Sequence, residues 1–136
     1  MSQEQLYSNV LVKIGVERSH LLSKEKLESL TNSNNLEEFA SELRETIYGE
    51  KLAKLKLPYT SRAFERVFHE QLIEVVIKIV RSSPELVSEF LETYLLKFEQ
   101  ENIKTVLRAV SVGLSYDEIK TKMYLSVENF LKRQEL

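Results

Sequence analysis

The sequence predicts an all-α fold: a compact multi-helix domain with two long antiparallel helices, at about 61–82 and 84–112, and several short helices. The chain of 136 residues holds only 3 glycines and 2 prolines, which leaves little material for the tight turns of an all-β fold. Nearly all acidic residues are glutamate, a good helix former, and Asp117 is the single aspartate. Signals for the start of a helix also recur along the chain. These three observations favour helices throughout.

The length of the chain fits one helical domain that covers residues 1–136 and buries a core of its own. Because there is no cysteine, the chain cannot form disulfides, thiolate metal sites or a cysteine nucleophile. A net charge of -2 disfavours nucleic acid as a partner, since binding to phosphates normally needs a strong positive excess.

The apolar stretches of the sequence are too short to cross a bilayer, which takes roughly 20 apolar residues. The densest run, at 72–77, already contains Glu74. The first ten residues, MSQEQLYSNV, lack the basic-then-apolar pattern of a secretory signal. We therefore expect a cytoplasmic protein with no membrane span of its own, which is peripheral to a membrane only through partner subunits.

The chain is expected to begin with two helices. The first covers about residues 3–20, although Gly15 weakens the pattern. Ser23 is a plausible N-cap for a short second helix, which ends in the Asn/Ser cluster at 31–35.

A third short helix is expected to follow that cluster. Asn35 and Glu38 resemble a capping box, in which the glutamate side chain reaches back to the N–H of the capping residue. The helix would run to about Thr46, with Gly49 as a left-handed stop. Residues 56–59, which include a proline, then break the helical pattern.

The first long helix is predicted at about 61–82 from apolar residues that recur every three or four positions. These residues are Phe64, Phe68, Leu72, Val75, Val76, Ile79 and Val80. β-Branched residues are dense at 75–80, so a strand is the competing interpretation there. Charged residues on the opposite side recur with the same period and favour the helix; they are Glu70, Glu74, Lys78 and Arg81.

The second long helix is predicted from Pro84, which loses no hydrogen bond at the first helical position. It would run to Gly113, an expected C-terminal cap. Residues 115–118 form a further capping box, and short helices near 116–122 and 127–134 would finish the chain.

The sequence shows no residue pattern that is typical of catalysis or of cofactor binding. Three scattered glycines cannot build a phosphate-binding loop, and His20 and His69 are isolated from other metal ligands. The glutamates of the first long helix alternate with basic residues, which indicates a salt-bridged surface rather than paired catalytic carboxylates. These residues are Glu65, Glu70, Glu74, Arg62, Arg66 and Lys78. We therefore expect no enzyme activity, no catalytic, cofactor-binding or metal-binding residue, no cofactor and no small-molecule ligand.

The stretch FEQENIKTVLRA, at 98–109, places four polar residues in the middle of the second long helix. At about 100° per residue, Asn102 falls into the apolar stripe that should be buried. The other members of this stripe are Leu91, Leu95, Phe98, Val106 and Ala109. A buried amide must find hydrogen-bond partners, so Asn102 is predicted to bond backbone or a polar group and to set the packing register.

Four charged residues share another edge of the same helix: Lys97, Glu101, Lys104 and Arg108. Lys97 and Glu101 can pair at i,i+4, and the other two lie toward the helix C-terminus, where the dipole favours cations. One interpretation is a solvated helix face, which the residues alone favour. The other is an edge that docks an acidic partner helix or subunit.

Residues 98–108 resemble a segment of the family of C subunits of archaeal/vacuolar-type (A/V-type) ATP synthases, which includes the d subunit of the vacuolar ATPase. The family segment reads aromatic-acid-x-x-Asn-Ile-Lys-x-(Ile/Val)-Leu-Arg. Similar segments follow the family's order at 7–10, 21–23, 36–49 and 82–84. The family often has Trp and Asp where this chain has Phe98 and Glu99, and full-length members contain three related helical modules, of which this chain holds about one.

The resemblance implies a non-catalytic rotor part. Family members sit on the membrane-embedded ring, receive the central stalk in a funnel-like socket, and transmit torque without binding nucleotide. The partners implied are the membrane rotor ring and the central-stalk subunits of a proton- or sodium-transporting rotary ATPase. The alternative is a free-standing helical adaptor that has kept the fold and lost the rotor role.

Overall fold

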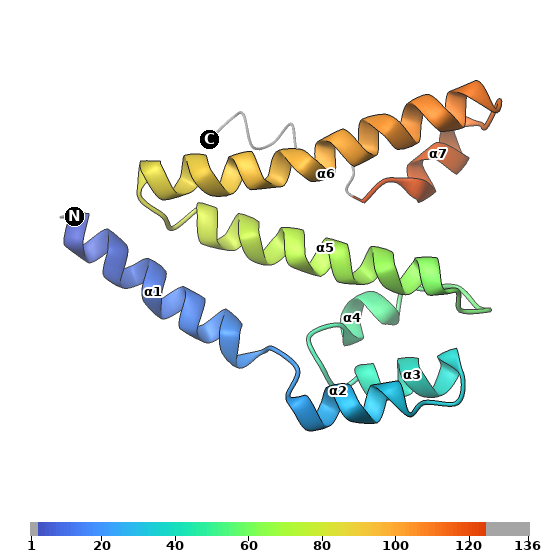
Figure 1. The fold of residues 1–136 in the computed structure, drawn as a ribbon, viewed down its shortest axis with the longest axis horizontal. Coiled ribbons are helices and arrows are strands. Elements are labelled where there is room, and N and C mark those ends of the chain that lie inside the picture. The colour runs from blue at the N-terminus through green and yellow to red at the C-terminus, as the bar shows by residue number, and fades with distance from the viewer. Residues whose placement is uncertain (1–2, 125–136) are drawn as a thin grey trace. The chain divides into compact units, whose positions relative to one another are not determined.

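A computed structural model describes residues 3–124, and every regular element in that range is a helix (Figure 1). The predicted all-α fold is therefore confirmed. The contacts divide the chain into two compact units, and the boundary between them in the sequence falls between Ser88 and Glu89. That the whole chain forms one domain, and that its two long helices pack antiparallel, stay predictions. The expected helix at 127–134 lies outside the described residues.

The first unit contains five helices: α1 Gln3–Ser19, α2 Lys24–Thr31, α3 Leu36–Leu43, α4 Gly49–Leu52 and α5 Ser61–Val80. Polar caps begin three of them, because the side chains of Ser23, Asn35 and Thr60 accept hydrogen bonds from N–H groups in the first turns of α2, α3 and α5. The predicted caps at Ser23 and Asn35 are thus confirmed.

The core of this unit lies where α2, α3 and α4 meet the first half of α5. Its fully packed members are Leu30, Ala40, Leu43, Leu52, Phe64 and Val67. Aromatic rings surround them: Phe39 meets Phe64 edge-on with ring centroids 5.1 Å apart, and Tyr48 meets Phe68 at the same distance. Such edge-to-face pairs add to the stability from area burial alone.

The region after α3 differs from the sequence-based expectation. The helix ends at Leu43 instead of near Thr46, and Gly49 begins α4 instead of acting as a left-handed stop. A Cβ at Gly49 would lie 2.1 Å from the backbone oxygen of Arg44. The residue is therefore glycine because the chain turns back closely on itself, a contact that no local pattern announces.

The capping box at Asn35 also differs in one detail. The Asn35 side chain accepts from the N–H of Glu38, but the Glu38 carboxylate accepts from the N–H of Asn34, at 2.8 Å, one residue earlier than the motif requires. The function of the box, satisfying free N–H groups at the helix start, is kept.

The first long helix is confirmed as α5, and the strand interpretation of 75–80 is wrong. Its buried residues differ in part from the predicted stripe, because Leu72 is 41% exposed while Val67, Gln71 and Ile73 are buried. Ile73 lies nine residues after Phe64, or two and a half turns, and so on the opposite side of the helix. α5 is covered on more than one side, which a single apolar stripe does not predict.

The second unit is built from α6 Glu85–Ser111, which begins just before the boundary at Ser88, and from α7 Tyr116–Lys122. Gly113 has φ 76°, the left-handed conformation predicted for it. The N–H of Leu114 bonds to the carbonyl of Ala109, and the N–H of Gly113 to that of Val110. This Schellman motif ends α6, and the predicted capping box of Ser115 and Glu118 begins α7.

Candidate functional site

The candidate site lies on α6, the longest helix described. Its 27 residues span roughly 40 Å at a rise of about 1.5 Å per residue. Because both ends of α6 are defined by local signals, one proline and one Schellman motif, the side chains along it keep a fixed order and spacing.

The inner side of α6 buries Leu95, Phe98, Asn102 and Ala109. Asn102 is 7% exposed, and its Oδ1 accepts a hydrogen bond from the backbone N–H of Tyr124 at 2.9 Å. The rings of Phe98 and Tyr124 meet edge-on beside it, with centroids 6.2 Å apart. One polar and one aromatic contact therefore hold the segment after α7 against α6.

The outer edge of α6 carries Lys97, Glu101, Lys104 and Arg108, and all four side chains are exposed. We call these four residues the α6 edge. Lys104 Nζ lies 2.6 Å from Glu101 Oε1. This hydrogen bond and the charge of Lys104, followed by the charge of Arg108, lower the pKa of Glu101, which therefore stays ionised at neutral pH.

The pair that could form between Lys97 and Glu101 is replaced by another contact. Lys97 Nζ donates to the hydroxyl of Tyr94 at 2.8 Å and lies 4.0 Å from the centroid of that ring and 4.8 Å from that of Phe98. The aromatic rings hold the Lys97 ammonium by a cation–π interaction, while Glu101 forms its ion pair with Lys104. The edge therefore carries three cations and one carboxylate, which pairs with Lys104, and keeps an excess of two positive charges.

With this excess of positive charge, the α6 edge can attract carboxylates of another protein. Its four charged side chains are exposed to solvent. Its chemistry suits electrostatic docking, in which exposed charges orient a partner.

The other titratable residues considered from the sequence serve local structure. Arg66 Nε bonds Glu70 Oε1 at 2.8 Å, and His69 Nδ1 lies 2.7 Å from the backbone oxygen of Glu65. His20 Nδ1 lies 3.9 Å from Glu17. Within residues 3–124, no group of three or more His, Asp or Glu side chains could hold a metal ion.

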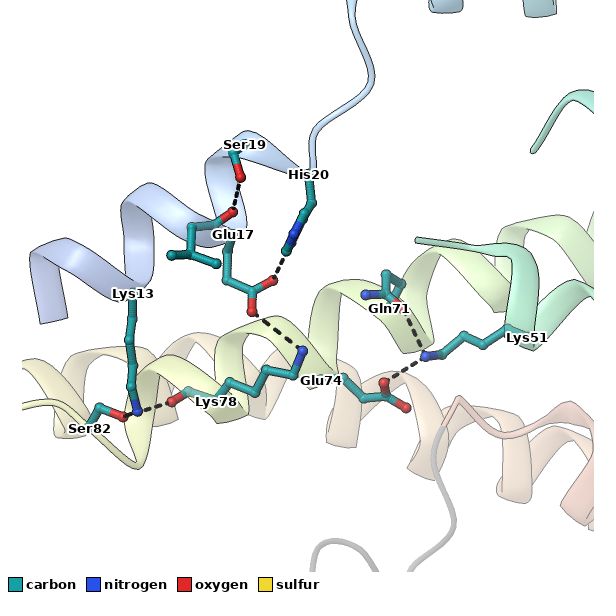
Figure 2. A network of polar contacts seen from close by, with 10 residues as sticks. Lys13, Glu17, Ser19, His20, Lys51, Gln71, Glu74, Lys78 and Ser82 are labelled. Carbon is teal, nitrogen blue, oxygen red and sulfur yellow. Dashed lines mark hydrogen bonds and ion pairs between the residues drawn. The ribbon is translucent and has the colours of Figure 1, made fainter. Parts of the chain in front are cut away.

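Sequence reasoning missed a polar contact between α4 and α5, shown in Figure 2. Gln71 is buried, and its Oε1 accepts from Lys51 Nζ at 2.8 Å; the same ammonium lies 2.6 Å from Glu74. The available signal was the position of Gln71 seven residues after Phe64, on the same face of the helix. Its partner, 20 residues earlier in the chain, carried no such signal.

The described helices include none that is long and apolar enough to cross a membrane.

Comparison with known proteins agrees with the resemblance on α6. The family model of the ATP synthase (C/AC39) subunit matches residues 10–134. The C subunit of the A-type ATP synthase of Methanocaldococcus jannaschii is 34% identical over an alignment of 116 residues that covers 82% of this chain and 28% of that protein. The corresponding C subunit of Pyrococcus furiosus is 29% identical over 108 residues, covering 79% of this chain and 29% of that protein.

The chain thus spans less than a third of the length of these relatives. No solved structure matches it. The match to the family model nevertheless runs through nearly all of the chain and includes the whole of α6. The chain therefore belongs to the ATP synthase (C/AC39) subunit family.

Proposed function

We propose that this chain is a non-catalytic central-stalk connector subunit, or one module of it, in a rotary A/V-type ATP synthase or ATPase. It would couple the membrane rotor ring to the soluble stalk during proton or sodium transport. The observation that carries the proposal is the family match over residues 10–134, together with relatives named as C subunits of A-type ATP synthases. In this role the protein is cytoplasmic and meets the membrane only through partner subunits.

The geometry of the second unit suits a mechanical role. A connector must transmit force without bending, and α6 is a long helix with a well-defined end. The Asn102 contact and the Phe98–Tyr124 rings also tie the following segment to it. Rigid elements hold a binding edge in place better than loops do.

We assign the α6 edge as a surface that meets another subunit of the complex. Its excess of positive charge selects a partner surface with carboxylates, such as an acidic helix. Lys97 and Arg108 are 11 residues apart, roughly 16 Å along a helix axis, so the partner's carboxylates should have a similar separation. Exposed charges at the border of an interface orient the partner, and they affect the rate of association more than the affinity for the partner.

The test is purification of the complex from native membranes through a tag on this chain, followed by mass spectrometry. The expected result is recovery of ring and stalk subunits of a rotary ATPase in stoichiometric amounts. Recovery of the chain without any of these subunits would refute the proposal and favour the free-standing adaptor.

The docking assignment is tested by Lys97→Glu combined with Arg108→Glu, against the control Lys54→Glu with Lys56→Glu. Both double variants change the net charge by the same amount at exposed lysine or arginine positions. We expect the α6 variant to lower the yield of co-purified subunits, or to make it more sensitive to salt, while the control retains them. Equal yields from the two variants would show that the edge does not dock a partner.

A further inference from the structure

The N-terminal helix α1 exposes more apolar side chain than a surface helix normally does. Val10 is its single buried residue among those described, whereas Leu11 and Val12 are 68% and 67% exposed. Tyr7, Ile14 and Val16 are exposed as well. A helix that is apolar on most sides normally has neighbours on most sides, so apolar side chains that stay exposed along such a helix indicate an interaction surface.

One side of α1 is already occupied by α5. Lys13 Nζ bonds the hydroxyl of Ser82, and Glu17 Oε1 lies 3.4 Å from Lys78 Nζ (Figure 2). Val10, about one turn before Lys13, is the buried residue on this side. The three α1 residues fall on one side of the helix at about 100° per residue. Of the exposed apolar residues, Leu11, Val12 and Val16 lie on other sides. Tyr7 and Ile14 border the occupied side, at about 60° and 40° from Val10.

A narrow seam runs along the exposed part of α1. Its apolar members are Tyr7, Leu11 and Ile14, spaced by four and three residues, and one step beyond each end stand Glu4 and Arg18. At about 100° per residue the five fall within about 80° of one another. Spacing of this kind is the pattern by which two helices pack along a common line. We call these five residues the α1 seam.

The charges at the two ends of the α1 seam indicate which partner can pack on it. Glu4 stands at one end and Arg18 at the other, both are exposed, and neither forms an ion pair within residues 3–124. Two copies packed antiparallel would bring Glu4 of each beside Arg18 of the other, with Leu11 close to Leu11 at the two-fold axis. Parallel packing would place like charges together, which is unfavourable. The seam is therefore self-complementary in one orientation only, as the interface of a two-fold dimer must be.

From this order we propose that a second copy of this chain docks on α1, in an antiparallel pair about a two-fold axis near Leu11. The proposal stands independently of the role of α6 in a rotary complex. The interface is small, so we expect a reversible dimer with a dissociation constant on the order of micromolar.

Charge reversal tests the orientation as well as the surface. Glu4→Lys and Arg18→Glu should each weaken self-association of the 136-residue chain roughly tenfold, because both charge contacts of the dimer become repulsive. An equimolar mixture of the two variants should associate as well as the wild type. In that mixed pair, each contact again joins opposite charges. Sedimentation equilibrium of the single variants and of the mixture gives the three constants.

Cysteine cross-linking gives a second and more local measurement, since the chain has no native cysteine. Leu11→Cys at the two-fold axis should form a disulfide-linked dimer under mild oxidation. Val16→Cys, exposed on another side of α1, is the control and should stay largely monomeric. Far-UV circular dichroism checks that both variants keep their helices.

A wild-type chain that is monomeric up to roughly 100 μM, well above the expected dissociation constant, would overturn the proposal. The proposal would also be overturned if neither charge reversal changed the dissociation constant of the dimer. Cross-linking through Val16→Cys as fast as through Leu11→Cys would overturn it too. Restored association in the mixture, together with selective cross-linking at residue 11, would establish it.

Discussion

The buried amide of Asn102 allows a prediction that separates hydrogen bonding from space filling. Its Oδ1 accepts the backbone N–H of Tyr124 at 2.9 Å. The change Asn102→Ala removes this bond and leaves a partly buried donor without a partner. A net hydrogen bond contributes about 1 kcal/mol, and an orphaned buried donor costs about 1–3 kcal/mol. We therefore expect a loss of about 1–3 kcal/mol in the free energy of unfolding.

The change Asn102→Leu restores volume without restoring the acceptor. Replacing one partner of a buried hydrogen bond by an apolar group still leaves the other group unsatisfied, so this variant should also be less stable than the wild type, by about 1 kcal/mol. Gln100→Ala, at an exposed amide on the same helix, is the control and should change stability by no more than about 0.5 kcal/mol.

Urea unfolding followed by circular dichroism measures the stability of these variants. Amide hydrogen exchange at Tyr124 measures the contact itself, and exchange should be roughly tenfold faster in both Asn102 variants. If Asn102→Leu is as stable as the wild type or more stable, with the same spectrum and unchanged exchange at Tyr124, the register role assigned to this amide is wrong.

Three further predictions follow from contacts elsewhere. Gly49→Ala should cost more than about 2 kcal/mol in urea unfolding, because a Cβ there lies 2.1 Å from the backbone carbonyl oxygen five residues earlier. The N–H and then the hydroxyl of Ser115 bond the Glu118 carboxylate and lower its pKa. The stability from this group is present above the ordinary glutamate pKa and lost as pH falls through the lower folded-state value, so Glu118→Gln should flatten the decline in melting temperature below about pH 4.5. Lys51→Met should cost about 1–2 kcal/mol in the same urea assay, since the buried oxygen of Gln71 loses its donor.

Each of these has a matched control. Gly15→Ala should not destabilise, because a Cβ there meets nothing within 4 Å. Lys54→Met, at an exposed lysine one turn after Lys51, should be neutral. Glu37→Gln, at an exposed first-turn glutamate of α3, should leave the acid decline nearly unchanged. Equal effects of test and control at any site would contradict the contact assigned there.

Some features of the candidate site follow from residues close in the sequence, and others from residues far away in it. The position of Asn102 in the buried stripe and the exposure of the α6 edge both follow from helical periodicity, which the sequence contains. The partner of Asn102 lies 22 residues away in the chain, and the partner of Lys97 proved to be aromatic instead of acidic. Periodicity tells which way a side chain points but not what it meets.

The sequence by itself determined the helices and most of their ends. Ser23, Asn35, Ser115 and Gly113 act within one turn of their own position, so their effect is the same whatever packs around them. Only the tertiary structure decided that Gly49 meets a carbonyl, that Gln71 is buried in place of Leu72, and that the apolar residues of α1 stay exposed. The Gly49 contact depends on how the connection after α3 turns back on Arg44. The burial of Gln71 and the exposure of the α1 residues depend on where another helix lies, and a periodic pattern on one helix carries no information about the position of the next.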